Sequence, residues 1–127
     1  MKLSALYQIF LDCQSVTTDS RNCPDGSLFI ALKGESFNGN AFAKLALDSG
    51  CAFAIIDEIQ YAIEGDQRYI LVDDCLQTMQ QLANYHRRQL GTRVIGITGT
   101  NGKTTTKELI SSVLCQNHNV LYTLGNL

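Results

Sequence analysis

The stretch that decides the fold is Val94-Ile95-Gly96-Ile97-Thr98-Gly99-Thr100-Asn101-Gly102-Lys103-Thr104-Thr105. An apolar run at residues 94–97 leads into a glycine-rich turn, and a helical pattern then continues to about residue 116. Glycines let the backbone come close to a phosphate, and the unpaired N–H groups at a helix N-terminus attract anions. We therefore predict that residues 99–105 form a phosphate-binding loop between a strand and a helix.

The loop departs from the general phosphate-loop pattern at one position. That pattern has a glycine five residues before Gly102, where this chain has Ile97. The Gly-Lys-Thr sequence and the strand–loop–helix context remain. In such loops the lysine, here Lys103, reaches the β- and γ-phosphates, and the next hydroxyl, here Thr104, binds Mg²⁺. These two are the predicted catalytic residues; the alternative is a glycine turn that merely caps a helix.

Outward from the loop, strand and helix patterns alternate along the whole chain. Apolar or β-branched runs predict strands at residues 15–18, 28–32, 52–56, 69–72, 94–97 and 120–122. Helices are predicted at residues 3–12, between the 34–40 loop and Gly50, from an Asp74 N-cap to residue 90, and after the phosphate loop. This alternation favours an α/β fold. The pattern restarts at Gly91-Thr92, which predicts a boundary between residues 1–90 and 91–127.

Helical spacing also predicts which side chains are buried. One expected face consists of Phe42, Leu45, Ala46 and Ser49, and another of Leu109, Ile110, Val113 and Leu114. We interpret His86 as a packed side chain rather than a metal ligand, because no second ligand is spaced with it. Asp73-Asp74 imitates the metal-binding end of a strand, but its spacing to Gln77 favours a helix cap.

The composition is that of an ordinary globular protein. The 127 residues are 45% hydrophobic and 17% charged with a net charge of −2, so neither nucleic acid nor a membrane is an expected partner. The five cysteines show no CxxC spacing, which argues against a disulfide framework or a zinc site and fits the cytoplasm. The sequence has no stretch typical of a signal peptide or a membrane-spanning helix.

With its loop Gly99-Thr100-Asn101-Gly102-Lys103-Thr104, the chain resembles the Mur ligase superfamily, the ATP-dependent amide-bond ligases of peptidoglycan synthesis. Loops of that family read Gly-Thr/Ser-Asn/Ser-Gly-Lys-Thr/Ser and lack the first glycine in the same way. Thr18-Asp19-Ser20-Arg21 and residues 26–34 are similar to the family's uridine-nucleotide domain. Residues 105–110 and Thr123-Leu124-Gly125-Asn126 are similar to the member that adds D-alanyl-D-alanine.

The resemblance implies a small uridine-nucleotide-binding α/β domain at residues 1–90. It implies the first βαβ unit of a P-loop ATPase domain at residues 91–127, with the rest of the ligase beyond Leu127. The implied cofactors are ATP and Mg²⁺, and the substrates are UDP-MurNAc-tripeptide and D-Ala-D-Ala. The substrate carboxylate attacks the γ-phosphate of ATP, and the amine then displaces phosphate from the acyl phosphate.

The resemblance also implies a pocket for the uridine part of the substrate. Its residues are Thr18, Ser20 and Arg21 in one loop and Glu35, Ser36 and Asn38 in another. The family often has Asp-Gly-His where this chain has Asn38-Gly39-Asn40, so the role of Asn40 stays open. Without the resemblance, Ser20 and Arg21 read as ordinary turn residues.

Other functions share these features. The sister ligase that adds the third peptide residue has both motifs, and a non-catalytic UDP-sugar-binding module or a GTP-dependent switch would keep the loop. Residues 91–127 are too few for a complete ATPase domain. We therefore expect the 127 residues alone to lack ligase activity and to self-associate through exposed sheet edges, whereas the whole ligase is expected to be a monomer.

Overall fold

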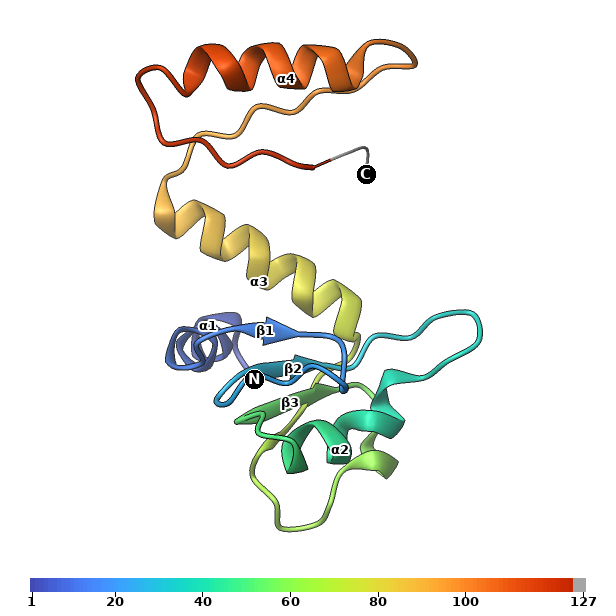
Figure 1. Ribbon diagram of the computed structural model, residues 1–127. Coiled ribbons are helices and arrows are strands. Elements are labelled where there is room, and N and C mark those ends of the chain that lie inside the picture. Colours follow the sequence, from blue (N-terminus) through green and yellow to red (C-terminus); the bar gives the residue numbers. More distant parts are fainter. Residues whose placement is uncertain (125–127) are drawn as a thin grey trace. The chain divides into compact units, whose positions relative to one another are not determined.

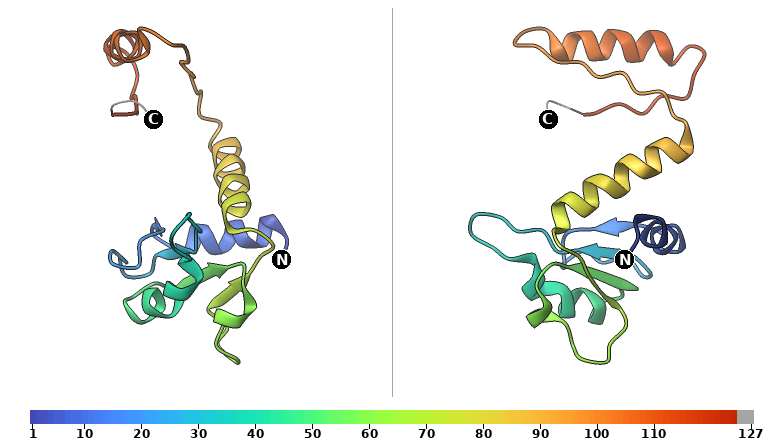
Figure 2. Two further views of the ribbon diagram at one scale, coloured as in Figure 1. Left: turned by 90° about the vertical axis from the view of Figure 1, so that its right-hand side faces the viewer. Right: turned by 180° about the vertical axis from the view of Figure 1, so that it is seen from behind.

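The computed structural model describes residues 1–124, and the chain divides into two compact units, Met1–Gly91 and Thr92–Leu127. The first unit is built on a four-stranded parallel sheet (Figure 1). Its strands lie in the order in which they occur in the chain: β1 (Val16–Thr17), β2 (Leu28–Ile30), β3 (Phe53–Ile56) and β4 (Tyr69–Leu71). Because all four are parallel, their carboxyl ends lie at one edge, and the loop after β2 projects beyond that edge (Figure 2).

The helices of this unit are α1 (Leu3–Asp12), α2 (Ala43–Asp48) and α3 (Cys75–Leu90), with short 3₁₀ turns η1 (Gly39–Phe42) and η2 (Ile59–Tyr61). α1 packs on α3, where the ring centroids of Tyr7 and Tyr85 lie 4.8 Å apart. The Tyr7 hydroxyl is 3.0 Å from Nδ1 of His86, whose ring also meets Phe10 edge-on. The prediction that His86 is a packed side chain is thus confirmed.

Strand β2 is buried on both faces of the sheet. Ile30 lines an apolar pocket of about 240 Å³ together with Phe10 of α1 and Leu82 of α3, so these helices cover one face. Alternation turns Phe29 to the opposite face, where α2 contacts β2 and β3. Such two-sided burial accounts for the continuous apolar sequence of the strand.

The buried face of α2 differs from the predicted one. Ala43, Ala46 and Leu47 point into the core, whereas Phe42 and Leu45 are 44% and 50% exposed. The phase of this short helix is set by η1, which buries Asn40 and delivers the chain to the sheet with Ala43 inward. Small alanines let the helix approach the sheet closely, and Phe42 and Leu45 are turned outward.

Among residues 92–124 of the second unit, the regular structure is one helix, α4 (Lys103–Leu114). The predicted strands at 94–97 and 120–122 are not formed, because neither segment has a hydrogen-bonded strand partner in the described chain. The predicted buried stripe of α4 is only partly formed: Leu109 and Val113 are 64% and 70% exposed, whereas Ile110 and Leu114 are half-buried. Ser111 is the buried residue of this helix.

Candidate functional site

The carboxyl edge of the parallel sheet gathers the polar loops of the first unit. Ligands of open α/β sheets bind outside this edge, because the loops there are free of the core. Thr18, Ser20 and Arg21 follow β1, and the loop with Glu35, Ser36 and Asn38 follows β2. The topology therefore brings both predicted uridine loops to the same edge of the sheet.

The loop after β1 is a compact turn. Thr17 donates from Oγ1 to the carbonyl of Asn22 at 2.9 Å. The Asp19 carboxylate accepts from the backbone N–H of Arg21 at 2.9 Å and from its guanidinium at 2.9 and 3.0 Å. Hydrogen bonds from Arg21 lower the pKa of Asp19. The Arg21 side chain is 87% exposed, so part of its guanidinium faces solvent at the predicted pocket.

The loop after β2 closes on itself. Lys33 and Asn38 form an isolated antiparallel bridge, and the N–H of Gly34 donates to the Phe37 carbonyl at 3.0 Å. The Phe37 ring packs over Gly34, where a Cβ would displace it. Glu35 and Ser36 are exposed at the tip. The predicted polar residues thus sit on a tight loop with a fixed base.

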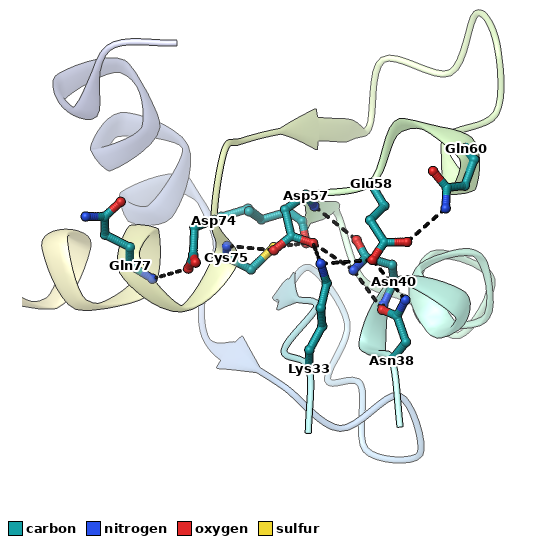
Figure 3. A network of polar contacts seen from close by, with 10 residues as sticks. Lys33, Asn38, Asn40, Asp57, Glu58, Gln60, Asp74, Cys75 and Gln77 are labelled. Atoms are coloured by element: carbon teal, nitrogen blue, oxygen red, sulfur yellow. Dashed lines mark hydrogen bonds and ion pairs between the residues drawn. The ribbon is translucent and has the colours of Figure 1, made fainter. Parts of the chain in front are cut away.

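At that base, Asn40 is 1% exposed and joins the loop to β3 (Figure 3). Its Nδ2 donates to Oδ1 of Asp57 at 2.9 Å and to Oδ1 of Asn38 at 2.8 Å. Its Oδ1 accepts from the N–H of Asp57 at 3.0 Å. Asn40 therefore lies behind the loop in the interior, not on the surface that a nucleotide would meet.

The lysine of this cluster is neutralised by two carboxylates. Lys33 Nζ lies 3.0 Å from Asp57 and 2.8 Å from Glu58, and hydrogen bonds to Glu58 and Asp57 raise its pKa. Burial raises the pKa of Asp57, but hydrogen bonds from the N–H of Cys75, from Asn40 and from Lys33 outweigh this, so the net shift is downward. Lys33, although 45% exposed, thus pairs with two carboxylates and links the loop to the residues that follow β3.

Sequence reasoning missed Lys33, Asp57 and Glu58. A signal was present, because Asp57 directly follows the apolar run at 52–56 and so stands at the carboxyl end of a predicted strand. Its partners, however, come from segments distant in the sequence.

The predicted phosphate loop lies at the N-terminus of α4. Gly102 is the N-cap with φ +74°, and Gly99 has φ +147°, both in the region that favours glycine. Lys103 is the first helical residue and is half-buried, whereas Thr104 and Thr105 are exposed. The first-turn N–H groups of a 12-residue helix thus face the loop, which suits a phosphate.

No cluster of three or more His, Cys, Asp or Glu side chains within residues 1–124 is placed to hold a metal ion. None of the helices in that range is long and apolar enough to cross a membrane. Gly125 and Asn126, which contribute to the resemblance, lie outside the described residues.

Comparison with protein families identifies the class. The Mur ligase family, catalytic domain, matches residues 12–87, and the Mur ligase middle domain matches residues 97–127. The chain therefore belongs to the Mur ligase family, and the resemblance read from the phosphate loop is confirmed. The α/β fold class is confirmed with it.

Individual relatives narrow the class further. The chain is 46% identical over 111 residues to the UDP-N-acetylmuramoyl-tripeptide--D-alanyl-D-alanine ligase of Bacillus subtilis (strain 168), covering 87% of this chain and 24% of the relative. It is 38% identical over 113 residues to the ligase of the same name from Escherichia coli (strain K12), covering 89% and 24%. It is also 37% identical over 107 residues to the UDP-N-acetylmuramoyl-L-alanyl-D-glutamate--2,6-diaminopimelate ligase of Chlorobium phaeobacteroides, covering 82% and 21%.

Solved structures of MurF ligases are also similar to this chain. The MurF ligase from Thermotoga maritima in complex with ADP matches with a TM-score of 0.81 and 30% identity over 93% of this chain and 27% of that one. MurF from Acinetobacter baumannii matches with a TM-score of 0.80 and 32% identity over 98% and 30%. The chain thus spans about a quarter of the length of the curated relatives it matches.

Proposed function

We propose that this chain forms the UDP-substrate-binding part and the ATP-phosphate loop of a ligase that joins D-Ala-D-Ala to UDP-MurNAc-tripeptide. One observation carries the proposal: the identity to ligases of that name extends through both units, from the uridine-loop segment to the phosphate loop. The retained Lys103 and Thr104 argue against a loop that has lost its function.

In this proposal the first unit binds the uridine part of the substrate. Thr18, Ser20 and Arg21 meet it from one loop, and Glu35, Ser36 and Asn38 from the other. Serine and threonine hydroxyls can hydrogen-bond a base or ribose, and the exposed part of Arg21 can pair with a diphosphate. The amide nitrogen of Asn38 donates one N–H to Glu58, which leaves its second N–H for the nucleotide.

The second unit binds ATP. The backbone N–H groups of residues 99–105 surround the phosphates, and the Lys103 ammonium balances the charge that develops on the transferred phosphoryl group. Thr104 would hold Mg²⁺ through its hydroxyl, and the ion when bound adds to that charge balance. The substrate carboxylate takes the γ-phosphoryl group, and the amine of D-Ala-D-Ala then forms the amide bond as phosphate leaves.

The proposal includes the setting of the reaction. The partners of the ligase are small molecules, with no nucleic acid or membrane involved, and the ligase acts in the bacterial cytoplasm. The whole ligase is proposed to be a monomer, whereas these 127 residues alone are proposed to be inactive and to self-associate. Ligase turnover by the 127-residue chain would contradict the proposal that these residues alone are inactive.

Calorimetric titration of the chain tests both binding functions. Ser20→Ala should weaken UDP-MurNAc-tripeptide at least fivefold without affecting ADP, and Lys103→Ala should weaken ADP at least tenfold without affecting the UDP-substrate. Ser112→Ala, at an exposed serine of α4, and Lys44→Ala, at an exposed lysine of α2, are the matched controls. Unchanged affinity in either test variant removes that residue from its proposed site.

The second candidate is the sister ligase that adds a diamino acid as the third peptide residue, which the Chlorobium relative favours. A phosphate-release assay on the longer ligase separates the two activities. We expect turnover with UDP-MurNAc-tripeptide and D-Ala-D-Ala. Turnover only with UDP-MurNAc-dipeptide and a diamino acid would replace the first proposal by the second.

A further inference from the structure

Asn40 is the point at which the loop after β2 is fastened to the rest of the first unit. Each polar atom of its buried side chain has a partner: Nδ2 donates to Asn38 and Asp57, and Oδ1 accepts from the N–H of Asp57. The neighbouring backbone is fixed too. The N–H of Gly39 donates to the Leu32 carbonyl at 2.8 Å, and the space where a Cβ on Gly39 would stand is filled by that same carbonyl.

The first residue of the loop, Lys33, also contacts the residues that follow β3. Lys33 reaches both Asp57 and Glu58, and Glu58 accepts from Nδ2 of Asn38 at 3.1 Å. Asp57 in turn accepts from the N–H of Cys75, the first residue of α3, at 3.1 Å. Both stems of the loop are therefore held by the two residues that follow β3 (Figure 3).

We propose that Asn40 is a positioning residue for the uridine nucleotide, acting through Asn38 and Asp57 rather than by contact. It is too deeply buried to touch a ligand, but it fixes the loop that presents Glu35 and Ser36 at the carboxyl edge. This inference rests on the proposed function of the first unit.

A carboxylate or a methyl group cannot replace this amide. Asn40→Asp keeps the shape of the side chain but loses both Nδ2 donors and sets two carboxylates against each other. Asn40→Ala removes one of the donors to Oδ1 of Asn38 and one of the donors to Oδ1 of Asp57, and it leaves the N–H of Asp57 without its acceptor. In both variants the loop is expected to sample other conformations, and the nucleotide must then order it on binding.

The test is calorimetric titration of the 127-residue chain with UDP-MurNAc-tripeptide at a temperature where thermal unfolding shows every variant folded. We expect Asn40→Asp and Asn40→Ala to weaken binding at least tenfold. Leu82→Ala, a core truncation on the face covered by α1 and α3, is the control for lost stability and should bind within twofold of wild type. Asn84→Ala is the control at an exposed asparagine of α3.

The outcomes separate the two proposals. Absence of binding by the wild-type chain overturns the proposed function, and this inference with it. Wild-type affinity in the Asn40 variants, or equal weakening in Leu82→Ala, overturns the positioning role and leaves the proposed function standing. Glu58→Ala keeps the test open if both Asn40 variants unfold, because this side chain is partly exposed. It should weaken binding at least threefold, and unchanged affinity would again overturn the inference.

Discussion

Replacing Asp57 by alanine should destabilise the first unit more than any change to a surface carboxylate. The Asp57 side chain is 9% exposed and accepts from the N–H of Cys75 at 3.1 Å and from Nδ2 of Asn40 at 2.9 Å. A buried donor left without an acceptor costs about 1–3 kcal/mol. Lys33 is nearly half exposed and can regain water, so its loss adds little. The N–H of Cys75 and one N–H of the Asn40 amide would lose their acceptor, which predicts that the free energy of unfolding falls by about 3 kcal/mol.

Urea unfolding of the 127-residue chain, followed by tyrosine fluorescence, measures this loss. Tyr7, Tyr61, Tyr69 and Tyr85 all lie in the first unit, so the signal reports mainly on that unit. With an m-value of about 1.5 kcal/mol/M, the midpoint should fall by about 2 M. Asp48→Ala is the matched control, because its carboxylate pairs with Lys44 on the exposed side of α2 and should shift the midpoint little. A free energy of unfolding for Asp57→Ala within about 0.5 kcal/mol of wild type would refute the argument that Asp57 unites loop and helix.

Three further results are expected. The pKa of Asp57 is lowered in the folded state, so its carboxylate stabilises the fold at neutral pH. The difference in free energy of unfolding between wild type and Asp57→Asn should therefore be complete above about pH 4 and shrink as the pH falls through the folded-state pKa. Urea unfolding that gives the same difference at pH 7 and at pH 3 would contradict this. Burial raises the pKa of Cys75 to about 12, so a thiol reagent at pH 8 should label exposed Cys115 first and Cys75 only on unfolding, as peptide mapping can show. Gly102→Ala forces a side chain to φ +74°, at a cost of about 1–2 kcal/mol, and should weaken ADP in calorimetry; undiminished affinity would mean that the loop does not need this conformation.

The secondary structure of the first unit was predictable because its signals are local. Asp74 caps α3 as its spacing to Gln77 predicts, with the N–H of Gln77 donating to the carboxylate at 2.7 Å. The same helix ends at Leu90, where Gly91 takes φ +63°. Caps and glycine stops depend on a few neighbouring residues, so the sequence alone contains them.

Features that depend on distant partners were not predictable. The apolar run at 94–97 has strand composition, but a strand exists only where another strand completes its hydrogen bonds. Leu109 and Val113 have the spacing of a buried stripe, yet burial requires a surface to pack against, and these two side chains stay largely exposed among the described residues. The buried face of α2 depended on a turn that the pattern of apolar residues does not reveal.

In the candidate site, too, the features that depend on neighbouring residues were predictable and those that depend on distant partners were not. The phosphate loop was read directly, since its glycines, lysine and helix are contiguous in the sequence. The uridine loops came from family resemblance, and their role stays a prediction. The hydrogen bond between Asn40 and Asp57 joins residues 17 positions apart, and the sequence of neither segment alone predicts this pairing.

The strand order β1-β2-β3-β4 has a consequence for how the chain acquires its structure during synthesis. Each strand pairs with the one made just before it, so the sheet can grow by addition as the polypeptide leaves the ribosome, without waiting for a later segment. The contact between Tyr7 and His86 is different, because it closes a separation of 79 residues. Loop-closure entropy makes such a contact late. Until α3 has emerged, the face of the sheet beside α1 is only half covered, and that interval is when the nascent protein has most need of protection from aggregation.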